Sequence, residues 1–312
     1  MIKGNVREPN FLIGGTAAAG TSFLSAILVQ HPEIYLPRKM RPEPHFFYKS
    51  WEFEKGLNAY LENWFDKVPS ESIAVGERSS SYLFGGSEVA KKIATYYPNM
   101  RFVFTLRNPV ERTWANYRYT VLEGLETLDF EEALLSENQR ILEQQGIWAE
   151  IQPYNYTGRG YYARQLQCFF DLFPAENILI LKSEDLAADT DRNLSRIYDF
   201  LRLETKQSRY VRPPNHTSVN VLNASVQAEL REQLAEKFDE AVEAVRQQLD
   251  FRELNFSVNE YHLLNKLQNN LTASKIEMPT WAKKYLTNLF KEDMADLRNL
   301  VDFDISDWIE TQ

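Results

Sequence analysis

The chain has 312 residues, of which 44% are hydrophobic and 13% aromatic, so it carries enough apolar material for one large core or a core with an appended piece. Its 35 Lys and Arg stand against 44 Asp and Glu, which gives a net charge of −9. Nucleic-acid-binding proteins usually carry a basic excess, so this balance argues against that class. It also disfavours a long polyanionic partner, unless a local basic groove overrides the global charge.

The sequence carries no pattern typical of secretion or membrane insertion. Residues 1–9 are polar and lack the apolar stretch of a signal peptide, and no apolar run approaches the roughly 20 residues of a membrane span. The single cysteine, Cys168, cannot form an intrachain disulfide, and its apolar helical surroundings indicate a core residue. We therefore expect a soluble, cytoplasmic protein without a membrane partner.

Short apolar runs alternate with helical segments through the first two thirds of the chain. Such alternation indicates a mostly parallel sheet with helices on both faces, an α/β fold. The predicted strands are 10–14, 73–76, 101–106 and 177–181, and the predicted helices are 21–30, 86–97, 190–203 and one that Pro109 opens.

The last third of the chain reads as helical throughout. Apolar residues recur at spacings of three and four from Val226 to Leu249, which predicts one long helix with a single apolar stripe. Short helices with aromatic anchors are expected from Ser257 onward. We predict two parts, an α/β domain over residues 1–256 and a C-terminal helical extension over residues 257–312. The extension either packs on the main domain or serves self-association, for example as a homodimer.

A small-residue loop follows the first predicted strand and opens a helix. Its sequence, Gly14-Gly-Thr-Ala-Ala-Ala-Gly-Thr-Ser22, lets the backbone approach an oxyanion closely, and the free N–H groups at the helix start can hold phosphate. The spacing Gly15-x4-Gly20 fits a P-loop, but Thr21 stands where that motif requires lysine. This departure weakens an ATP- or GTP-hydrolysing interpretation. A tight turn without a ligand is the simpler alternative.

A second stretch, Leu106 to Tyr117, places an arginine at the end of a strand. Arg107 would direct its bidentate guanidinium into the crevice where open α/β sheets bind ligands. Taken alone, it could be a structural arginine paired with Glu111.

The order of these and other motifs resembles the PAPS-dependent sulfotransferase family, with most similarity to the heparan-type glycan sulfotransferases and their bacterial relatives. PAPS is 3′-phosphoadenosine 5′-phosphosulfate, and PAP is the product nucleotide. The resemblance covers about residues 10–250 and implies a P-loop-like sheet. After the phosphate loop, the motifs that carry it are HPEI (31–34), EPHFF (43–47), Glu77-Arg78, LRNPVER (106–112) and GYYARQL (160–166).

The resemblance implies a role for each matching residue. Arg107 would bind the 3′-phosphate, and Glu43 would be the general base on the acceptor hydroxyl. His45 would position that hydroxyl or a carboxylate, and Arg78 would stabilise the sulfuryl charge or bind the acceptor. Without the family context, Glu43 would be a solvated loop carboxylate and His45 a packed core histidine. The 5′-phosphosulfate would be gripped by Ala17, Ala18, Ala19, Gly20, Thr21 and Ser22.

Two positions depart from the family pattern. Ala18 stands where the family usually carries a lysine or arginine that neutralises the bridging oxygen, and Ala115 stands where it carries a serine for the 3′-phosphate. Losing the loop cation costs several kcal/mol of transition-state stabilisation unless another cation replaces it. Asn116 could supply the hydrogen bond that Ala115 lacks. The candidate replacement cations are Arg38, Lys39, Arg41 and Arg78.

The family also closes a loop over the nucleotide, and residues 209–220 occupy that place. Tyr161 and Tyr162 could line the acceptor cleft, although helix packing explains them equally well. The loop residues expected to contact phosphate or adenine are Arg209, Arg212, Asn215 and His216.

Two hypotheses of different classes remain open from the sequence. The first is a sulfotransferase that moves the sulfuryl group of PAPS to a hydroxyl of a small-molecule or carbohydrate acceptor. No His/Cys cluster has the spacing of metal ligands, so no metal is expected. The second is a PAP-binding relative that has lost catalysis and acts as an interaction subunit, an idea motivated by Ala18 and Ala115. A P-loop kinase is a weaker third reading.

Overall fold

The computed structural model describes residues 7–37, 43–203, 210–213, 219–246 and 256–309. The chain divides into two compact units, which we call the sheet unit and the helical unit. The sheet unit comprises Met1–Arg112, Gly158–Pro213 and Leu286–Gln312, and the helical unit comprises Thr113–Thr157 and Pro214–Tyr285. No helix among the described residues is long and apolar enough to cross a membrane.

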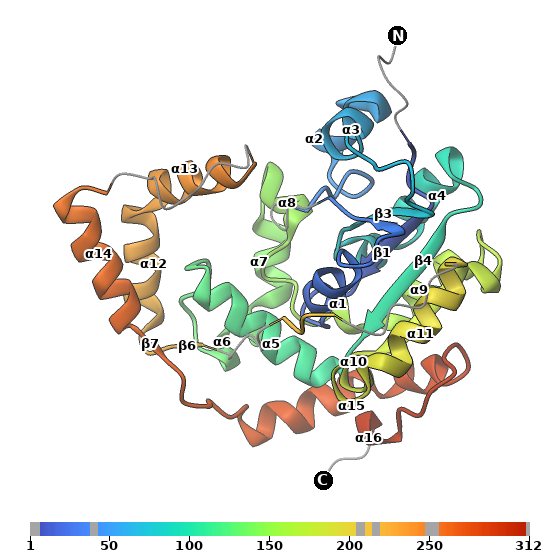
Figure 1. The fold of residues 1–312 in the computed structure, drawn as a ribbon. Coiled ribbons are helices and arrows are strands. Elements are labelled where there is room, and N and C mark those ends of the chain that lie inside the picture. The colour runs from blue at the N-terminus through green and yellow to red at the C-terminus, as the bar shows by residue number, and fades with distance from the viewer. Residues whose placement is uncertain (1–6, 38–42, 204–209, 214–218, 247–255, 310–312) are drawn as a thin grey trace. The chain divides into compact units, whose positions relative to one another are not determined.

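The sheet unit is built on five parallel strands in the order β2-β3-β1-β4-β5 (Figure 1). Parallel strands buried on both faces require continuous apolar runs, and β1 and β4 have them. This sheet confirms the predicted α/β fold with a mostly parallel, helix-flanked sheet. The strands are β1 (Phe11–Gly15), β2 (Ile34–Tyr35), β3 (Ala74–Arg78), β4 (Arg101–Leu106) and β5 (Ile178–Lys182).

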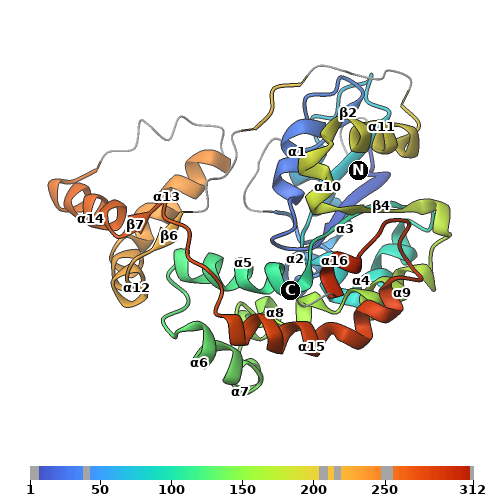
Figure 2. The same cartoon turned by 90° about the horizontal axis from the view of Figure 1, so that it is seen from below.

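Helices cover both faces of this sheet, as Figure 2 shows for α1, α10 and α11 on one side and α4 and α9 on the other. On the first side, Leu24 and Ile27 of α1 pack with Ile197 of α11. On the second, Phe102 of β4 stacks edge-on against Phe169 of α9, with ring centroids 5.2 Å apart. The helices of this unit are α1 (Thr21–Leu28), α2 (Ser50–Phe53), α3 (Gly56–Trp64), α4 (Tyr82–Tyr96), α9 (Tyr162–Phe170), α10 (Ser183–Ala188), α11 (Thr190–Leu201) and α16 (Ser306–Ile309), with short 3₁₀ turns at Gly158–Gly160 and Ala175–Asn177.

The C-terminal residues from Leu286 onward belong to the sheet unit. They begin within α15 (Thr280–Leu297), whose side chains Phe290 and Met294 are buried. Asp293 accepts the backbone N–H of Ala163 at 3.0 Å, at the start of α9, where a helix leaves its first N–H groups without partners. The last part of the chain is therefore tied to the sheet unit by hydrogen bonds as well as apolar packing. The division into an α/β domain over residues 1–256 and a C-terminal extension over residues 257–312 stays a prediction.

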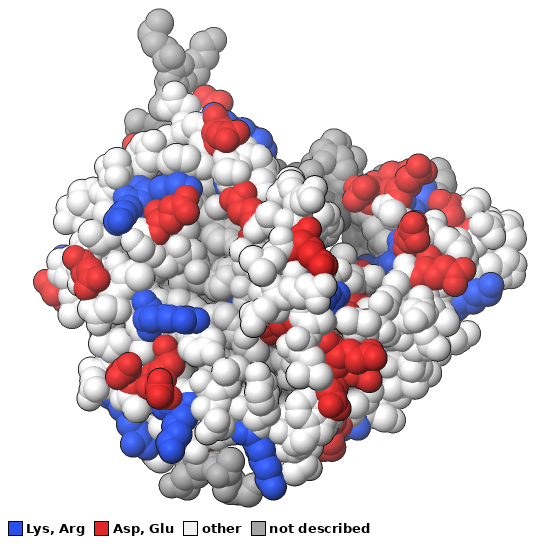
Figure 3. Space-filling view, turned by 180° about the vertical axis from the view of Figure 1, so that it is seen from behind, with Lys and Arg blue, Asp and Glu red and all other residues white. Residues whose placement is uncertain are grey.

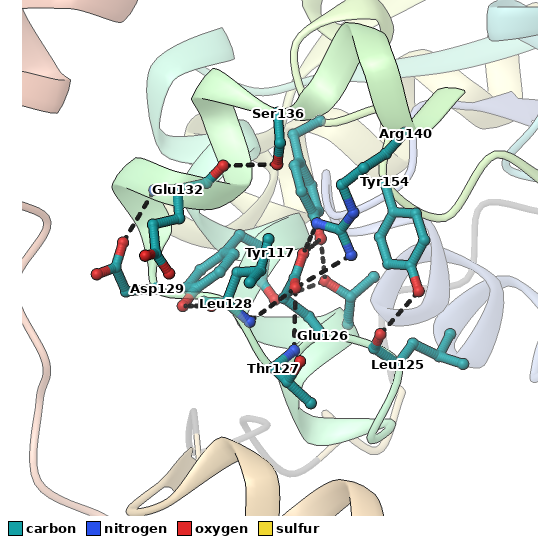
Figure 4. Close-up of polar contacts among 12 residues, drawn as sticks. Tyr117, Leu125, Glu126, Thr127, Leu128, Asp129, Glu132, Ser136, Arg140 and Tyr154 are labelled. Atoms are coloured by element: carbon teal, nitrogen blue, oxygen red, sulfur yellow. Dashed lines mark hydrogen bonds and ion pairs between the residues drawn. The ribbon is translucent and has the colours of Figure 1, made fainter. Parts of the chain in front are cut away.

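The helical unit includes a buried carboxylate that ties a loop to a helix (Figure 4). Glu126 has no exposed surface and receives Nη1 of Arg140 at 2.6 Å and the Tyr156 hydroxyl at 2.6 Å. It also accepts the backbone N–H groups of Thr127 and Leu128. These donors compensate the desolvated charge. The elements of the unit are α6 (Phe130–Leu135), α7 (Glu137–Glu143), α8 (Ile147–Ile151), α12 (Ala224–Gln233), α13 (Ala235–Arg246), α14 (Val258–Asn269), β6 (Asn220–Val221) and β7 (Leu271–Thr272), while α5 (Pro109–Leu122) runs through the boundary at residue 112.

The single long helix predicted from Val226 onward is wrong. The segment forms two helices, α12 and α13, which meet at Leu234, and residues 247–249 lie outside the described part of the chain. Leu234 is buried with Leu230 and with Leu263 of α14. The apolar spacing correctly indicates helices with a buried face. These leucines pack on a third helix, α14, although the helix is interrupted at Leu234.

Candidate functional site

The site residues gather where the parallel strands end. The chain passes from β1 toward β2 and β3 on one side of the sheet, and then to β4 and β5 on the other. The ends of β1 and β4 therefore form a topological switch point, the place where open α/β sheets bind ligands.

The loop after β1 has the backbone shape of an anion cradle. Ala18 and Gly20 both adopt left-handed backbone conformations, with φ of 64° and 83°. Gly20 precedes α1 without a side-chain cap, and the first turn of α1 carries no acidic residue. The unpaired N–H groups and the positive end of the helix dipole are thus left for an anion.

Arg107 lies directly against this loop. Its Nη1 donates to the carbonyl of Ala18 at 3.3 Å, across the gap between the ends of β1 and β4. The Tyr162 hydroxyl donates to the Arg107 carbonyl at 2.8 Å and fixes the backbone there. Tyr162 is fully buried, so for this tyrosine the helix-packing alternative fits the structure. The two sequence stretches singled out for phosphate binding are therefore neighbours.

Arg78, the last residue of β3, connects the loop to Glu43. Its Nη1 donates to the Ser22 hydroxyl at 3.1 Å and also to Oε1 of Glu43. The side chain of Arg78 is only 9% exposed, so this ion pair is largely shielded from solvent. Ser22 and Glu43, which lie 56 and 35 positions before Arg78 in the sequence, thus bind the same guanidinium group.

Glu43 is held in its charged form. The backbone N–H and the hydroxyl of Ser80 donate to Oε2 at 2.7 and 2.8 Å. Burial by itself raises the pKa of Glu43, but His45, Arg78 and the two Ser80 hydrogen bonds outweigh it and leave the pKa below its usual value. Glu43 is therefore ionised at neutral pH, which a proton acceptor requires.

His45 is a neutral partner of this carboxylate. Its Nε2 lies 3.4 Å from Oε2 of Glu43, and its Nδ1 lies 2.7 Å from the Ser81 hydroxyl. Burial lowers the pKa of His45 to about 4, although the charge of Glu43 opposes the change. The backbone of His45 has a φ of 49°, unusual for a residue with a side chain. Its N–H donates to the Ser79 hydroxyl at 2.7 Å.

A cavity of about 560 Å³ adjoins Glu43 and Arg78, a volume in the range of small-ligand sites. Among the described lining residues, Glu43, Glu77 and Arg78 are ionisable, and the others are uncharged. The lining residues are Ser25, Ala26, Val29, Gln30, Leu36, Pro37, Glu43, Pro44, Glu77 and Arg78.

The other predicted site residues belong to several different elements. Ala115 and Asn116 lie on α5 in the helical unit. Arg212 donates to the Ala187 carbonyl at 2.9 Å, and its guanidinium lies 5.6 Å from the Phe23 ring centroid. Tyr161 packs against Phe290. Outside the described residues lie Arg38, Lys39, Arg41, Arg209, Asn215 and His216.

Sequence reasoning missed the polar residues that surround Glu43 and His45. Ser79, Ser80 and Ser81 all bond to one of these two side chains or its backbone. Glu77 lies beneath them, fully buried. The available signal was the run of three serines, Ser79 to Ser81, that directly follows the buried strand β3.

Comparison with known proteins identifies the family. The model of the Sulfotransferase family matches residues 50–207, half of the chain. The chain belongs to the sulfotransferase family. The matched range includes Arg78 and Arg107, whereas the loop at 16–22 and Glu43 precede it. No group of three or more potential metal-binding side chains occurs in the part of the chain that the structure describes.

Individual relatives agree with this assignment and confirm the resemblance to heparan-type enzymes. Human heparan sulfate glucosamine 3-O-sulfotransferase 3A1 is 28% identical over 202 residues, which cover 65% of this chain and 46% of that protein. Human heparan sulfate glucosamine 3-O-sulfotransferase 6 is 28% identical over 201 residues, 64% of this chain and 54% of the relative. This sulfotransferase thus spans about half the length of the curated relatives it matches.

A solved bacterial structure extends the similarity over nearly the whole chain. The sulfotransferase from Alicyclobacillus acidocaldarius superposes with a TM-score of 0.68 at 26% identity, covering 98% of this chain and 100% of the other. The P-loop-like fold inferred for the sheet unit agrees with this neighbour.

Proposed function

We propose that this sulfotransferase moves the sulfuryl group of PAPS to a hydroxyl of a small-molecule or carbohydrate acceptor, with Glu43 as general base. The observation that carries the proposal is the position of Arg78, which bonds both to Ser22 at the start of α1 and to Glu43. One cation therefore joins the group that would hold the donor to the group that would deprotonate the acceptor.

The loop and Arg107 fit the two charged ends of a nucleotide donor. The N–H groups at the start of α1 would hold the 5′-phosphosulfate, and Arg107 would hold the 3′-phosphate. When bound, PAPS supplies the activated sulfuryl group. Thr21 and Ser22 would add hydroxyl donors at the loop.

Sulfuryl transfer balances with PAPS as donor, the acceptor hydroxyl and Glu43, and PAP leaves with the electron pair of the broken bond. The acceptor oxygen attacks sulfur in line, the bond between sulfur and the bridging phosphate oxygen breaks, and the acceptor proton passes to Glu43. A sulfuryl group near Ser22 would compete with Glu43 for Arg78, and the release of that ion pair would raise the basicity of Glu43. Arg78 would then stabilise the charge on the equatorial oxygens.

The cavity beside Glu43 supports a compact acceptor. Ala26, Val29 and Leu36 provide apolar walls, and Glu43 lies in the same lining. Such a pocket favours a molecule that presents one hydroxyl to the carboxylate and buries an uncharged body.

The substitution Glu43→Gln tests the proposal. We expect the rate of transfer from labelled PAPS to fall by about 10²- to 10⁴-fold, because the amide cannot accept the proton, while the Kd for PAP changes little. The assay uses a panel of hydroxyl-bearing acceptors, with Glu52→Gln as a surface control. Equal turnover by Glu43→Gln and wild type would remove Glu43 from the mechanism.

The alternative of a catalytically impaired, PAP-binding interaction subunit rests on Ala18 and Ala115. The same panel separates the two functions. PAP binding without turnover on any acceptor would favour the interaction subunit.

A further inference from the structure

A buried carboxylate lies beneath the Glu43–His45 pair and is not used by the mechanism above. Glu77 of β3 has no exposed surface. It accepts hydrogen bonds from the hydroxyls of Tyr82 at 2.6 Å, Ser79 at 2.9 Å and Tyr60 at 3.3 Å. Three hydroxyl donors converge on its two oxygens, an arrangement suited to a charged carboxylate.

The Ser79 hydroxyl connects Glu77 to the candidate site through hydrogen bonds. Ser79 Oγ donates to Oε2 of Glu77 and accepts the backbone N–H of His45 at 2.7 Å. A serine hydroxyl has one proton, so donation to Glu77 directs its lone pairs toward His45. The acceptor of the His45 N–H is thus oriented by Glu77.

His45, whose backbone N–H is bonded to Ser79, has a backbone conformation that its surroundings must stabilise. His45 has a φ of 49°, and a non-glycine residue persists there only when its surroundings fix it. Its ring contacts Glu43 and Ser81, so its backbone position also sets the environment of the proposed base.

We propose that Glu77 is a positioning residue for sulfuryl transfer, acting through Ser79 on His45 and thereby on Glu43. The proposal rests on the function proposed above. Although Glu77 is among the residues of the cavity lining, it has no exposed surface, so its carboxylate touches neither donor nor acceptor in this mechanism. Its ionised form accepts the Ser79 proton, whereas its protonated form would donate toward Ser79 and remove the restraint on the hydroxyl.

The carboxyl group of Glu77 changes its charge near neutral pH. Burial, helped by the nearby charge of Glu43, raises its pKa to about 7, although the three hydroxyl donors oppose the change. The titratable groups that face it are Tyr60 of α3, Tyr82 of α4 and Glu43, and the pKa values of both tyrosines are raised far above their usual value. Because the ionised form is the positioning form, kcat should rise with pH through about 7.

The test compares Glu77→Gln, Ser79→Ala and the double variant by kcat, KM and pH profile. In each variant we expect kcat to fall by about 10- to 100-fold with KM little changed, because a small misplacement of reacting groups has such an effect. Glu77→Gln should lose the rise in kcat near pH 7. The double variant should be no slower than the slower single variant, because both changes break one connection.

Glu126→Gln is the matched control, since it neutralises another fully buried carboxylate that a tyrosine hydroxyl contacts, in the helical unit. It should reduce stability and leave the pH profile of kcat unchanged. Tyr82→Phe keeps the charge of Glu77 but removes one donor, so it should move the rise in kcat to higher pH. This variant and Ser79→Ala keep the test decisive if Glu77→Gln does not fold.

Two failures are distinguishable. An inactive wild-type chain across all acceptors would reject the proposed function. An active wild type would overturn the positioning role if Glu77→Gln kept its kcat and pH profile, if Ser79→Ala kept its kcat, or if the two effects multiplied in the double variant.

Discussion

At the scale of residues, the loop after β1 carries Ala18 where the family usually has a cation, and Arg78 lies beside the start of α1. Ala18 provides no charge at the loop, and Arg78 contacts Ser22 in the first turn of the following helix. Arg38, Lys39 and Arg41 lie outside the described residues, so among the candidate replacements Arg78 is the one whose contacts support the assignment. We infer that Arg78 takes over the role of the missing loop cation.

This inference predicts a rescue. Arg78→Ala should lower kcat by about 10²- to 10³-fold, because a preorganised charge at the transition state is lost. Adding Ala18→Lys to that variant should recover at least tenfold, since the lysine restores the family's cation and the left-handed backbone already carries a side chain there. Ala18→Met in the same background matches the length without the charge and should recover nothing. Equal kcat for the lysine and methionine variants would contradict the assignment.

The buried, neutral His45 predicts a pH dependence of stability. Its pKa is about 4 in the folded chain and about 6.5 when unfolded, so the unfolded state binds more protons as pH falls below 6.5. Between pH 7 and pH 5 the histidine should remove about 2 kcal/mol from the free energy of unfolding. His45→Gln should lack this loss, as measured by urea denaturation at several pH values. Identical pH dependence in both proteins would show that His45 is not buried in its neutral form.

At the scale of elements, β1, β3, β4 and β5 could be predicted because buried parallel strands are short apolar runs between turn residues. The two-residue strand β2 and the helices α2, α3, α6, α7 and α8 were not predicted. Interruptions were harder to predict. The helix predicted at 86–97 matches the longer part of α4, but the short helical part from Tyr82, which precedes a kink at Gly86 with a non-helical φ of 52°, was not predicted. Likewise, the apolar stripe after Val226 runs across a break at Leu234 because α14 packs there.

The same limit applies to the site. The phosphate loop and Arg107 could be located from sequence, because each follows a strand directly and strand ends meet at one edge. The hydrogen bonds around Glu43 could not, because they depend on the left-handed backbone of His45 and on which faces of β3 Glu77 and Arg78 occupy. Family resemblance supplied Glu43 and His45, but the serines that hold them emerged only from the structure.

At the scale of the whole molecule, charge does not identify the acceptor. Lys and Arg side chains lie interspersed with Asp and Glu on the face drawn in Figure 3, in line with the net charge of −9. The described lining of the cavity carries a single cation, Arg78, which is already paired with Glu43. These features support the proposed uncharged acceptor body more than a polyanionic chain.

The central claim is that the start of α1 and Arg107 together hold the two charged ends of an adenosine donor, and calorimetric titration with PAP tests it most directly. We predict saturable binding of one nucleotide per chain and an affinity at least about tenfold weaker in Arg107→Ala, from the loss of charge-assisted hydrogen bonds to phosphate. No heat and no thermal stabilisation by PAP, or equal affinity in both proteins, would contradict it.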